Sequence, residues 1–147
     1  MELPCVNEVD SRGIRIDRAL GIIKIPLRNA RRHIIAYAKA SIDKYKLLSP
    51  YSYHAVKKGR KIYAASRVDG VNISMQEMII GKKAPPGHKI DHKNGNGLDN
   101  TNENLRFATD SQNVHNQQKK EGTTSRYFGV SWNKKTKKWR SGIVCKG

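Results

Sequence analysis

One stretch of the chain, residues 89–118, constrains the possible fold and chemistry more than any other. Its sequence is KIDHKNGNGLDNTNENLRFATDSQNVHNQQ. The pattern predicts, in order, a strand ending in Asp91-His92, a loop rich in Asn and Gly over 94–102, a brief strand over 104–107 and a capped helix over 110–118. The chemically useful side chains of this stretch are carboxylates, imidazoles and carboxamides.

These side chains suit metal-assisted cleavage of a phosphodiester bond. A hard divalent cation prefers oxygen ligands, and the Asp91 carboxylate and the Asn113 carboxamide can supply two of them. His92 can activate a water molecule as a general base, a task that requires a neutral imidazole. A second group often fixes the tautomer of such a histidine, and Asn104 is the candidate for that task.

Short motifs in this stretch carry a family resemblance. They are Asp91-His92, then Asn104-Leu105-Arg106, then Ala108-Thr109 with Gln112-Asn113. In this order they resemble the HNH endonuclease family, particularly its phage and homing-endonuclease branch. The resemblance implies a ββα-metal (His-Me finger) core in which Asp91 and Asn113 bind Mg²⁺ or Mn²⁺, His92 is the general base and Asn104 orients it. Turn formation alone explains the Asn-Gly pairs of the loop, but not the whole ordered set.

The charge of the chain indicates the kind of partner. Its 147 residues include 29 lysines and arginines but only 12 aspartates and glutamates, a formal net charge of +17. This balance favours a polyanion, and we expect double-stranded DNA. The sequence shows no apolar run that could span a bilayer, no basic amphipathic helix and no signal peptide, so we expect no membrane partner and a cytoplasmic location, in the host cell if the protein is phage-encoded. The two isolated cysteines fit a reducing compartment. For the oligomeric state we expect a monomer.

Residues 25–82 predict a small β-rich region, whereas residues 1–24 carry no pattern that we can assign. The expected strands are a short edge strand at 25–27, a buried strand within 33–41, and strands at 51–56, 61–68 and 71–73; the expected helices span 42–48 and 74–80. Asp69-Gly70 predicts a hairpin turn, and Gly81 ends the second helix. The order of these elements resembles the region that precedes many phage HNH cores and contacts DNA there. Gln76 stands where such proteins usually carry a histidine that helps at the site; the alternative is that Gln76 is an exposed helix residue.

Residues 83–119 form the predicted nuclease core, which a proline-stiffened linker at 82–87 joins to the preceding region. Residues 120–147 are predicted to be a connector followed by a hairpin with strands at 127–132 and 138–143. This hairpin resembles the start of an AP2-type DNA-binding domain, although a lone hairpin is only marginally stable in water. The DNA-binding candidates are Arg106, Arg126, Trp132, Lys134, Lys137, Trp139 and Arg140.

The sequence therefore predicts an α+β protein with a β-rich N-terminal region, a ββα-metal nuclease core and a C-terminal hairpin. The expected activity is hydrolysis of DNA phosphodiester bonds with one divalent metal ion, by nicking or by a double-strand break. One alternative is a non-catalytic DNA-binding protein on a decayed HNH scaffold. A basic RNA-binding or ribosome-associated protein fits the charge but leaves the motifs of residues 89–118 unexplained.

Overall fold

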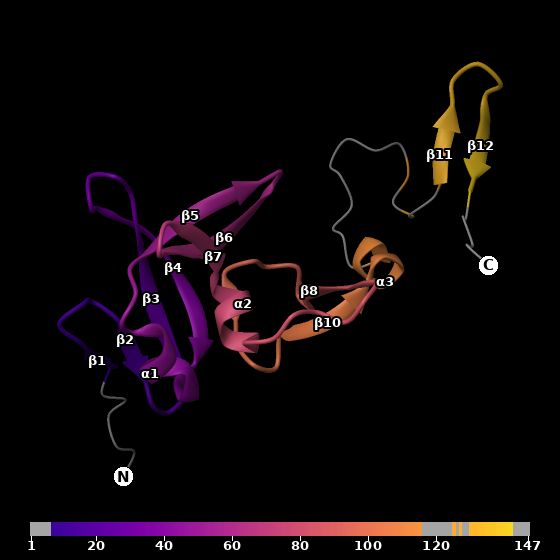
Figure 1. Cartoon of the computed structure of the whole chain (residues 1–147). Coiled ribbons are helices and arrows are strands. Elements are labelled where there is room, and N and C mark those ends of the chain that lie inside the picture. The colour runs from indigo at the N-terminus through magenta and orange to yellow at the C-terminus, as the bar shows by residue number, and fades with distance from the viewer. Residues whose placement is uncertain (1–6, 116–124, 126, 128–129, 143–147) are drawn as a thin grey trace, which may run out of the picture. The chain divides into compact units, whose positions relative to one another are not determined.

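The computed structural model describes residues 7–115, 125, 127 and 130–142. These residues belong to two units that divide the chain between residues 116 and 117. The fold is mixed and rich in strands, with short helices, which is compatible with the predicted α+β class (Figure 1). In the described ranges, no helix combines the length and the apolar character needed to cross a membrane.

The first unit contains short strands and helices, most of which are labelled in Figure 1. Its strands are β1 (Asn7–Val9), β2 (Arg15–Asp17), β3 (Ile22–Arg28), β4 (Ile34–Ser41), β5 (Tyr53–Lys58), β6 (Lys61–Val68), β7 (Val71–Ser74), β8 (His88–His92), β9 (Asp99–Asn100) and β10 (Leu105–Thr109). Its helices are the 3₁₀ turn η1 (Ile42–Lys44), α1 (Tyr45–Leu48), α2 (Met75–Ile80) and α3 (Asp110–His115).

An eight-stranded sheet forms the body of the first unit. The strand order is β1-β2-β3-β5-β6-β7, with β4 paired to β3 and β9 paired to β4. Alternate residues of β3, Ile23, Ile25 and Leu27, are buried, because side chains two apart share one face of a strand. Leu48 of α1 and Met75 of α2 complete this core. Most of the apolar burial therefore lies in the N-terminal two-thirds of the unit.

The predicted strand at 25–27 is present, but its predicted edge position is wrong. It is the middle of β3, which pairs with β2, β4 and β5. Proline is expected at an edge because it cannot donate to a ladder. Pro26 is nevertheless accommodated. The pairing of β3 with β2 ends at Lys24, and its pairing with β5 is at Leu27, so Pro26 lies between these two ladders on that side of the strand.

The predicted strand within 33–41 is also present, as β4, but it is buried only in its second half. Ile34 and Ile35 are 41% and 55% exposed, whereas Ala38 and Ala40 are fully buried. The unassigned residues 1–24 contain β1, β2 and the start of β3. Short, half-exposed strands of this kind give little alternation for a sequence pattern to detect.

The local signals around α2 are confirmed. Asp69 and Gly70 both have positive φ, 48° and 81°, as a tight hairpin turn between β6 and β7 requires. The Glu77 carboxylate accepts hydrogen bonds from the backbone N–H and the hydroxyl of Ser74 at the start of the helix. Gly81 ends the helix in the left-handed conformation, with φ 64°. Gln76 is thus fixed on a well-defined helical turn.

The second unit contains one antiparallel hairpin within the residues described. Its strands are β11 (Val130–Asn133) and β12 (Lys138–Ser141), which overlap the predicted strands 127–132 and 138–143. Tyr127 and Gly142 lie outside the observed strands, Asn133 belongs to β11, and residues 128, 129 and 143 lie outside the described residues. Trp132 and Trp139 face each other across the ladder with ring centroids 5.2 Å apart. The Asn133 side chain accepts hydrogen bonds from two backbone N–H groups of the turn, which stabilises the tip.

Candidate active site

Strands β8 and β10 place the two central residues of the predicted site. They are antiparallel, and Asp91 lies opposite Arg106 while His92 lies opposite Leu105. Helix α3 follows β10 directly and packs against both strands. Thr109 and Gln112 begin this helix by bonding reciprocally, each side chain accepting from the other's backbone N–H at 3.1 and 3.3 Å. Asn113, the predicted second metal ligand, follows Gln112 and is partly exposed.

His92 is held by a residue that the sequence analysis did not single out. Its Nε2 lies 3.1 Å from Oδ1 of Asn100, and the two side chains are buried, at 4% and 0% exposure. A carboxamide oxygen only accepts hydrogen bonds, so Nε2 carries the proton and the lone pair of the neutral ring resides on Nδ1. The pKa of His92 is lowered, chiefly by burial, against opposing contributions from the Asn100 hydrogen bond and the Asp91 charge. The lowered pKa favours the neutral form of His92, which a general base requires.

Asn104, the predicted partner of His92, has a different set of contacts. Its Oδ1 accepts from the backbone N–H of Asn94 at 3.0 Å, and its Nδ2 donates to Asn94 Oδ1 and to the Asp99 carbonyl at 3.0 and 2.6 Å. These bonds use both donors of the amide and its oxygen. Asn104 therefore bonds within the loop between the strands, while the carboxamide oxygen beside His92 Nε2 belongs to Asn100, four residues earlier.

Asp91 is a buried carboxylate with a cationic partner. Its Oδ2 accepts from Nε and Nη2 of Arg106 at 3.1 and 2.9 Å, and its side chain is 4% exposed. Arg106, predicted to contact DNA, thus supplies the counter-charge of the predicted metal ligand. A buried carboxylate needs such compensation, which a divalent cation can also provide. Carboxylate and carboxamide oxygens, which Asp91 and Asn113 offer, are the donor types that Mg²⁺ and Mn²⁺ prefer.

Strand β6 also borders the site. The Tyr63 ring lies 5.8 Å from the His92 ring, centroid to centroid. Burial, with a smaller contribution from Asp91, raises the pKa of the Tyr63 hydroxyl. Lys61, two residues earlier, lowers the pKa of His92 through its charge. These residues of the N-terminal sheet are part of the surroundings of the predicted base, and the sequence analysis missed them.

The loop that carries Asn100 is bound to the same sheet. Strand β9 pairs in parallel with β4, Asp99 opposite Lys39 and Asn100 opposite Ala40. Gly97 passes so close to β6 that a Cβ there would lie 2.5 Å from the Ile62 carbonyl oxygen. Only glycine allows this approach.

Comparison with known proteins identifies the region just described. Residues 73–115 match the sequence model of the family described as HNH endonuclease, and the match includes every candidate of β8, β9, β10 and α3. This region belongs to the HNH endonuclease family.

Two relatives extend the likeness of the HNH region. Protein 3.8 of Escherichia phage T7 is 36% identical over 63 residues, which are 43% of this chain and 52% of that protein. The uncharacterized HNH endonuclease L560 of Acanthamoeba polyphaga mimivirus is 34% identical over 95 residues, which are 64% of this chain and 48% of that protein. The chain thus spans about half the length of these curated relatives. No solved structure matches it.

Gln76 lies beside β8 and is partly buried, so it is not on an exposed helix face. It lines a hollow of about 800 Å³ with His88, Lys89 and Ile90 of β8. Its Oε1 is buried and has no hydrogen-bond partner among the described residues. Lys58, Lys82 and Lys83 also line this hollow, so its charge suits a phosphate group.

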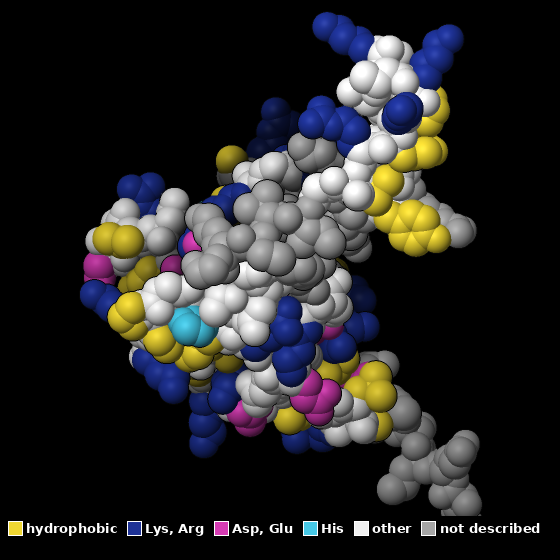
Figure 2. All heavy atoms as spheres, turned by 90° about the vertical axis from the view of Figure 1, so that its right-hand side faces the viewer, with side chains coloured by type: hydrophobic (Ala, Val, Ile, Leu, Met, Phe, Trp, Pro, Cys, Tyr) yellow, Lys and Arg dark blue, Asp and Glu magenta, His cyan; other side chains and the backbone are white. Residues whose placement is uncertain are grey.

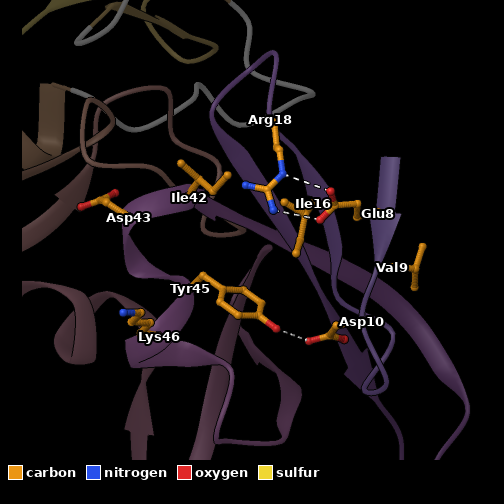
Figure 3. A pocket seen from close by; sticks show the side chains of 9 residues that line it. All are labelled: Glu8, Val9, Asp10, Ile16, Arg18, Ile42, Asp43, Tyr45 and Lys46. Atoms are coloured by element: carbon orange, nitrogen blue, oxygen red, sulfur yellow. Dashed lines mark hydrogen bonds and ion pairs between the residues drawn. The ribbon is translucent and has the colours of Figure 1, made fainter. Parts of the chain in front are cut away.

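A second hollow lies away from the HNH region, between β1, β2 and the η1–α1 segment (Figure 3). It measures about 550 Å³, and its acidic groups are already bonded. Arg18 forms an ion pair with Glu8 at 3.0 Å, and the Tyr45 hydroxyl donates to Asp10 at 2.9 Å. It contains none of the predicted site residues.

The remaining DNA-binding candidates lie on the second unit. Trp132 and Trp139 pack on each other yet stay 37% and 56% exposed, and the side chains of Lys134, Lys137 and Arg140 are exposed. Arg126 lies outside the described residues. Lysine and arginine side chains are frequent on the face seen in Figure 2, while acidic ones are few. This distribution is typical of a surface that meets a polyanion.

Proposed function

We propose that this chain is a metal-dependent endonuclease that hydrolyses phosphodiester bonds of double-stranded DNA. One observation carries the proposal: a buried His92, whose Nε2 is bonded to Asn100, lies beside a buried carboxylate, Asp91, within an HNH region. A general base and an anionic oxygen donor in adjacent positions are what metal-assisted hydrolysis needs.

In this proposal His92 performs the proton transfer. Its Nδ1 takes a proton from a water molecule as the water oxygen attacks the scissile phosphorus, and the bond from phosphorus to the 3′-oxygen breaks. Asp91 and Asn113 would hold the divalent ion. When bound, this ion supplies polarisation of the phosphate and stabilisation of the leaving oxygen. Asn100 keeps the imidazole in the tautomer that the transfer uses.

The basic surface holds the DNA backbone. The net charge of +17 and the lysines around the hollow beside β8 support phosphate contacts there. Residues 120–147, with paired tryptophans between basic side chains, are proposed to form a separate DNA-contacting hairpin. Such contacts position the duplex, and base contacts add whatever sequence preference exists.

The test is incubation of the protein with supercoiled plasmid in Mg²⁺ or Mn²⁺ and, separately, in EDTA. We expect nicked or linear product only with the metal ion. Binding of the plasmid without cleavage, across a range of metal ions and pH, would favour the second candidate, a non-catalytic DNA-binding protein. One observation favours that candidate, the ion pair of Arg106 with Asp91. The resemblance to phage HNH proteins adds a second reason, since Gln76 stands where such proteins usually carry a histidine.

A further inference from the structure

The buried side chain of Asn100 is arranged in a way that lowers the stability of the fold. The residue is fully buried, its Oδ1 accepts from His92, and its Nδ2 has no hydrogen-bond partner in the described part of the chain. A buried donor without a partner is destabilising, and a leucine of similar size would avoid that cost. The gain that remains is the hydrogen bond to the imidazole.

The backbone of Asn100 is fixed by the N-terminal sheet. It pairs with Ala40, a fully buried core residue of β4. Just before it, the Leu98 carbonyl accepts from the backbone N–H of Lys39 at 2.8 Å. Just after it, the Asn102 backbone N–H donates to the Ser41 hydroxyl at 2.9 Å. The sheet therefore determines where the carboxamide of Asn100 lies.

We propose that Asn100 is the positioning residue of the general base, and that the N-terminal sheet orients His92 through it. This inference rests on the proposed function. The Asn100 oxygen keeps the proton of the neutral imidazole on Nε2 and fixes the ring plane. The Nδ1 lone pair then has a constant direction for the proton of the attacking water. Asn104 shapes the loop and leaves this task to Asn100.

Two substitutions separate the acceptor from the bulk of the side chain. Asn100→Leu keeps the branched skeleton of the side chain and removes both the acceptor and the donor that lacks a partner. It leaves Nε2–H of His92 without its acceptor, so some loss of stability is expected. Asn100→Asp keeps an acceptor for Nε2–H. Asn102→Ala is the matched control, because it removes the bonds of another loop carboxamide to Asp43 at 3.1 and 3.2 Å without touching the His92 contact.

The first measurement uses the whole metal-free protein and needs no activity. ¹⁵N–¹H NMR of histidine-labelled protein should place the His92 proton on Nε2 in the parent, slowly exchanging with solvent. In Asn100→Leu this proton should exchange at least about tenfold faster, because its buried acceptor is gone. Asn102→Ala and Asn100→Asp should retain the slow exchange.

The second measurement separates rate from affinity. Asn100→Leu should lower the single-turnover cleavage rate about 10- to 100-fold, as loss of a partner that orients a histidine does, and change DNA affinity in EDTA by less than about twofold. Asn100→Asp should recover most of the lost rate. Asn102→Ala should stay within about twofold of the parent in both quantities.

The outcomes distinguish this proposal from the proposed function. A parent protein with the His92 proton on Nδ1, or an Asn100→Leu variant that cleaves within about twofold of an active parent, overturns the role of Asn100 alone. A parent that cleaves nothing refutes the proposed function, while the NMR result still decides whether Asn100 holds the imidazole. If Asn100→Leu fails to fold, the parent tautomer and the Asn100→Asp rate decide.

Discussion

Replacing Arg106 by Met tests whether this guanidinium is the resident counter-charge of Asp91. Two hydrogen bonds from the Arg106 guanidinium, at 3.1 and 2.9 Å, go to Oδ2 of Asp91. Methionine keeps the apolar stem of the side chain on β10 and removes only the charge and the donors. The Asp91 carboxylate, 4% exposed, then loses the two bonds and the charge of Arg106.

The expected loss of stability follows from the burial of the two groups. Breaking a fully buried ion pair costs about 3–5 kcal/mol, because it leaves a buried charge without compensation. The Arg106 side chain is 37% exposed, so water screens part of the interaction. We therefore expect the free energy of unfolding to fall by about 1–3 kcal/mol. For a unit of this size the melting temperature should fall by about 4–15 °C.

A divalent ion should reverse much of this loss. An ion that binds only the folded state stabilises it in proportion to its affinity. In the parent the ion competes with Arg106 for the carboxylate, whereas in Arg106→Met it does not. Saturating Mn²⁺ should therefore raise the melting temperature of the variant by more than that of the parent, and calorimetry should show tighter Mn²⁺ binding.

The assay is thermal unfolding by circular dichroism with and without Mn²⁺, beside Arg67→Met as the control, an exposed arginine of β6 outside the site. The control should melt like the parent and respond to Mn²⁺ as the parent does. If Arg106→Met is as stable as the parent, the ion pair contributes nothing. If Mn²⁺ stabilises both proteins equally, Arg106 does not compete with the ion, and the assignment of Asp91 as the ligand loses its support.

Further expected outcomes concern the base, the loop and the tail. His92→Ala should lower cleavage by about 10²–10⁴-fold and leave DNA affinity nearly unchanged, as measured on plasmid and by titration in EDTA. Burial lowers the pKa of His92 below its value in the unfolded chain. The contribution of His92 to stability is therefore present above the ordinary histidine pKa and is lost as pH falls through the folded-state pKa. Urea melts across that pH range should show a smaller pH dependence for His92→Gln than for the parent. Gly97→Ala should destabilise the protein by about 1–3 kcal/mol in thermal melts, because its Cβ meets the Ile62 carbonyl, while Gly142→Ala meets nothing and should be neutral. Removing residues 125–147 should weaken DNA binding yet spare cleavage at saturating enzyme, and affinity should fall with salt with a log–log slope of roughly −4.5 to −7 for about 5–8 phosphate contacts.

Sequence reasoning succeeded where a single short segment determines the structure. The turn at Asp69-Gly70 needs positive φ at both residues, and the start of α2 needs a polar cap, so a few letters suffice for each. The strands that carry Asp91 and Arg106 were likewise predictable, because each is a short run bounded by turn residues. The placement of Asp91 and Arg106 on paired strands therefore followed from residue types and their order.

The partner of His92 could not be predicted in this way. The loop of residues 94–102 has the composition of turns, and β9 is a strand of two residues without any periodic signal. Several asparagines of this loop offer the same carboxamide. Asn100 is selected only by the parallel pairing of β9 with β4, which joins distant parts of the sequence. A family motif names Asn104, and tertiary pairing is what brings Asn100 to the imidazole instead.

The attachment of β9 to the sheet also sets how firmly the base is held. Besides the ladder, the contacts include the Lys39–Leu98 backbone bond and the bonds of Asn102 to Ser41 and Asp43. At about 1 kcal/mol each, such bonds give about 3 kcal/mol against detachment, to which the ladder adds. Losing the side-chain bonds of Asn102 to Asp43 should therefore leave the loop mostly attached, so the rate should barely change. Losing the Asn100 acceptor removes the orientation even when the loop stays attached, and this difference is why Asn102→Ala is a fair control for Asn100→Leu.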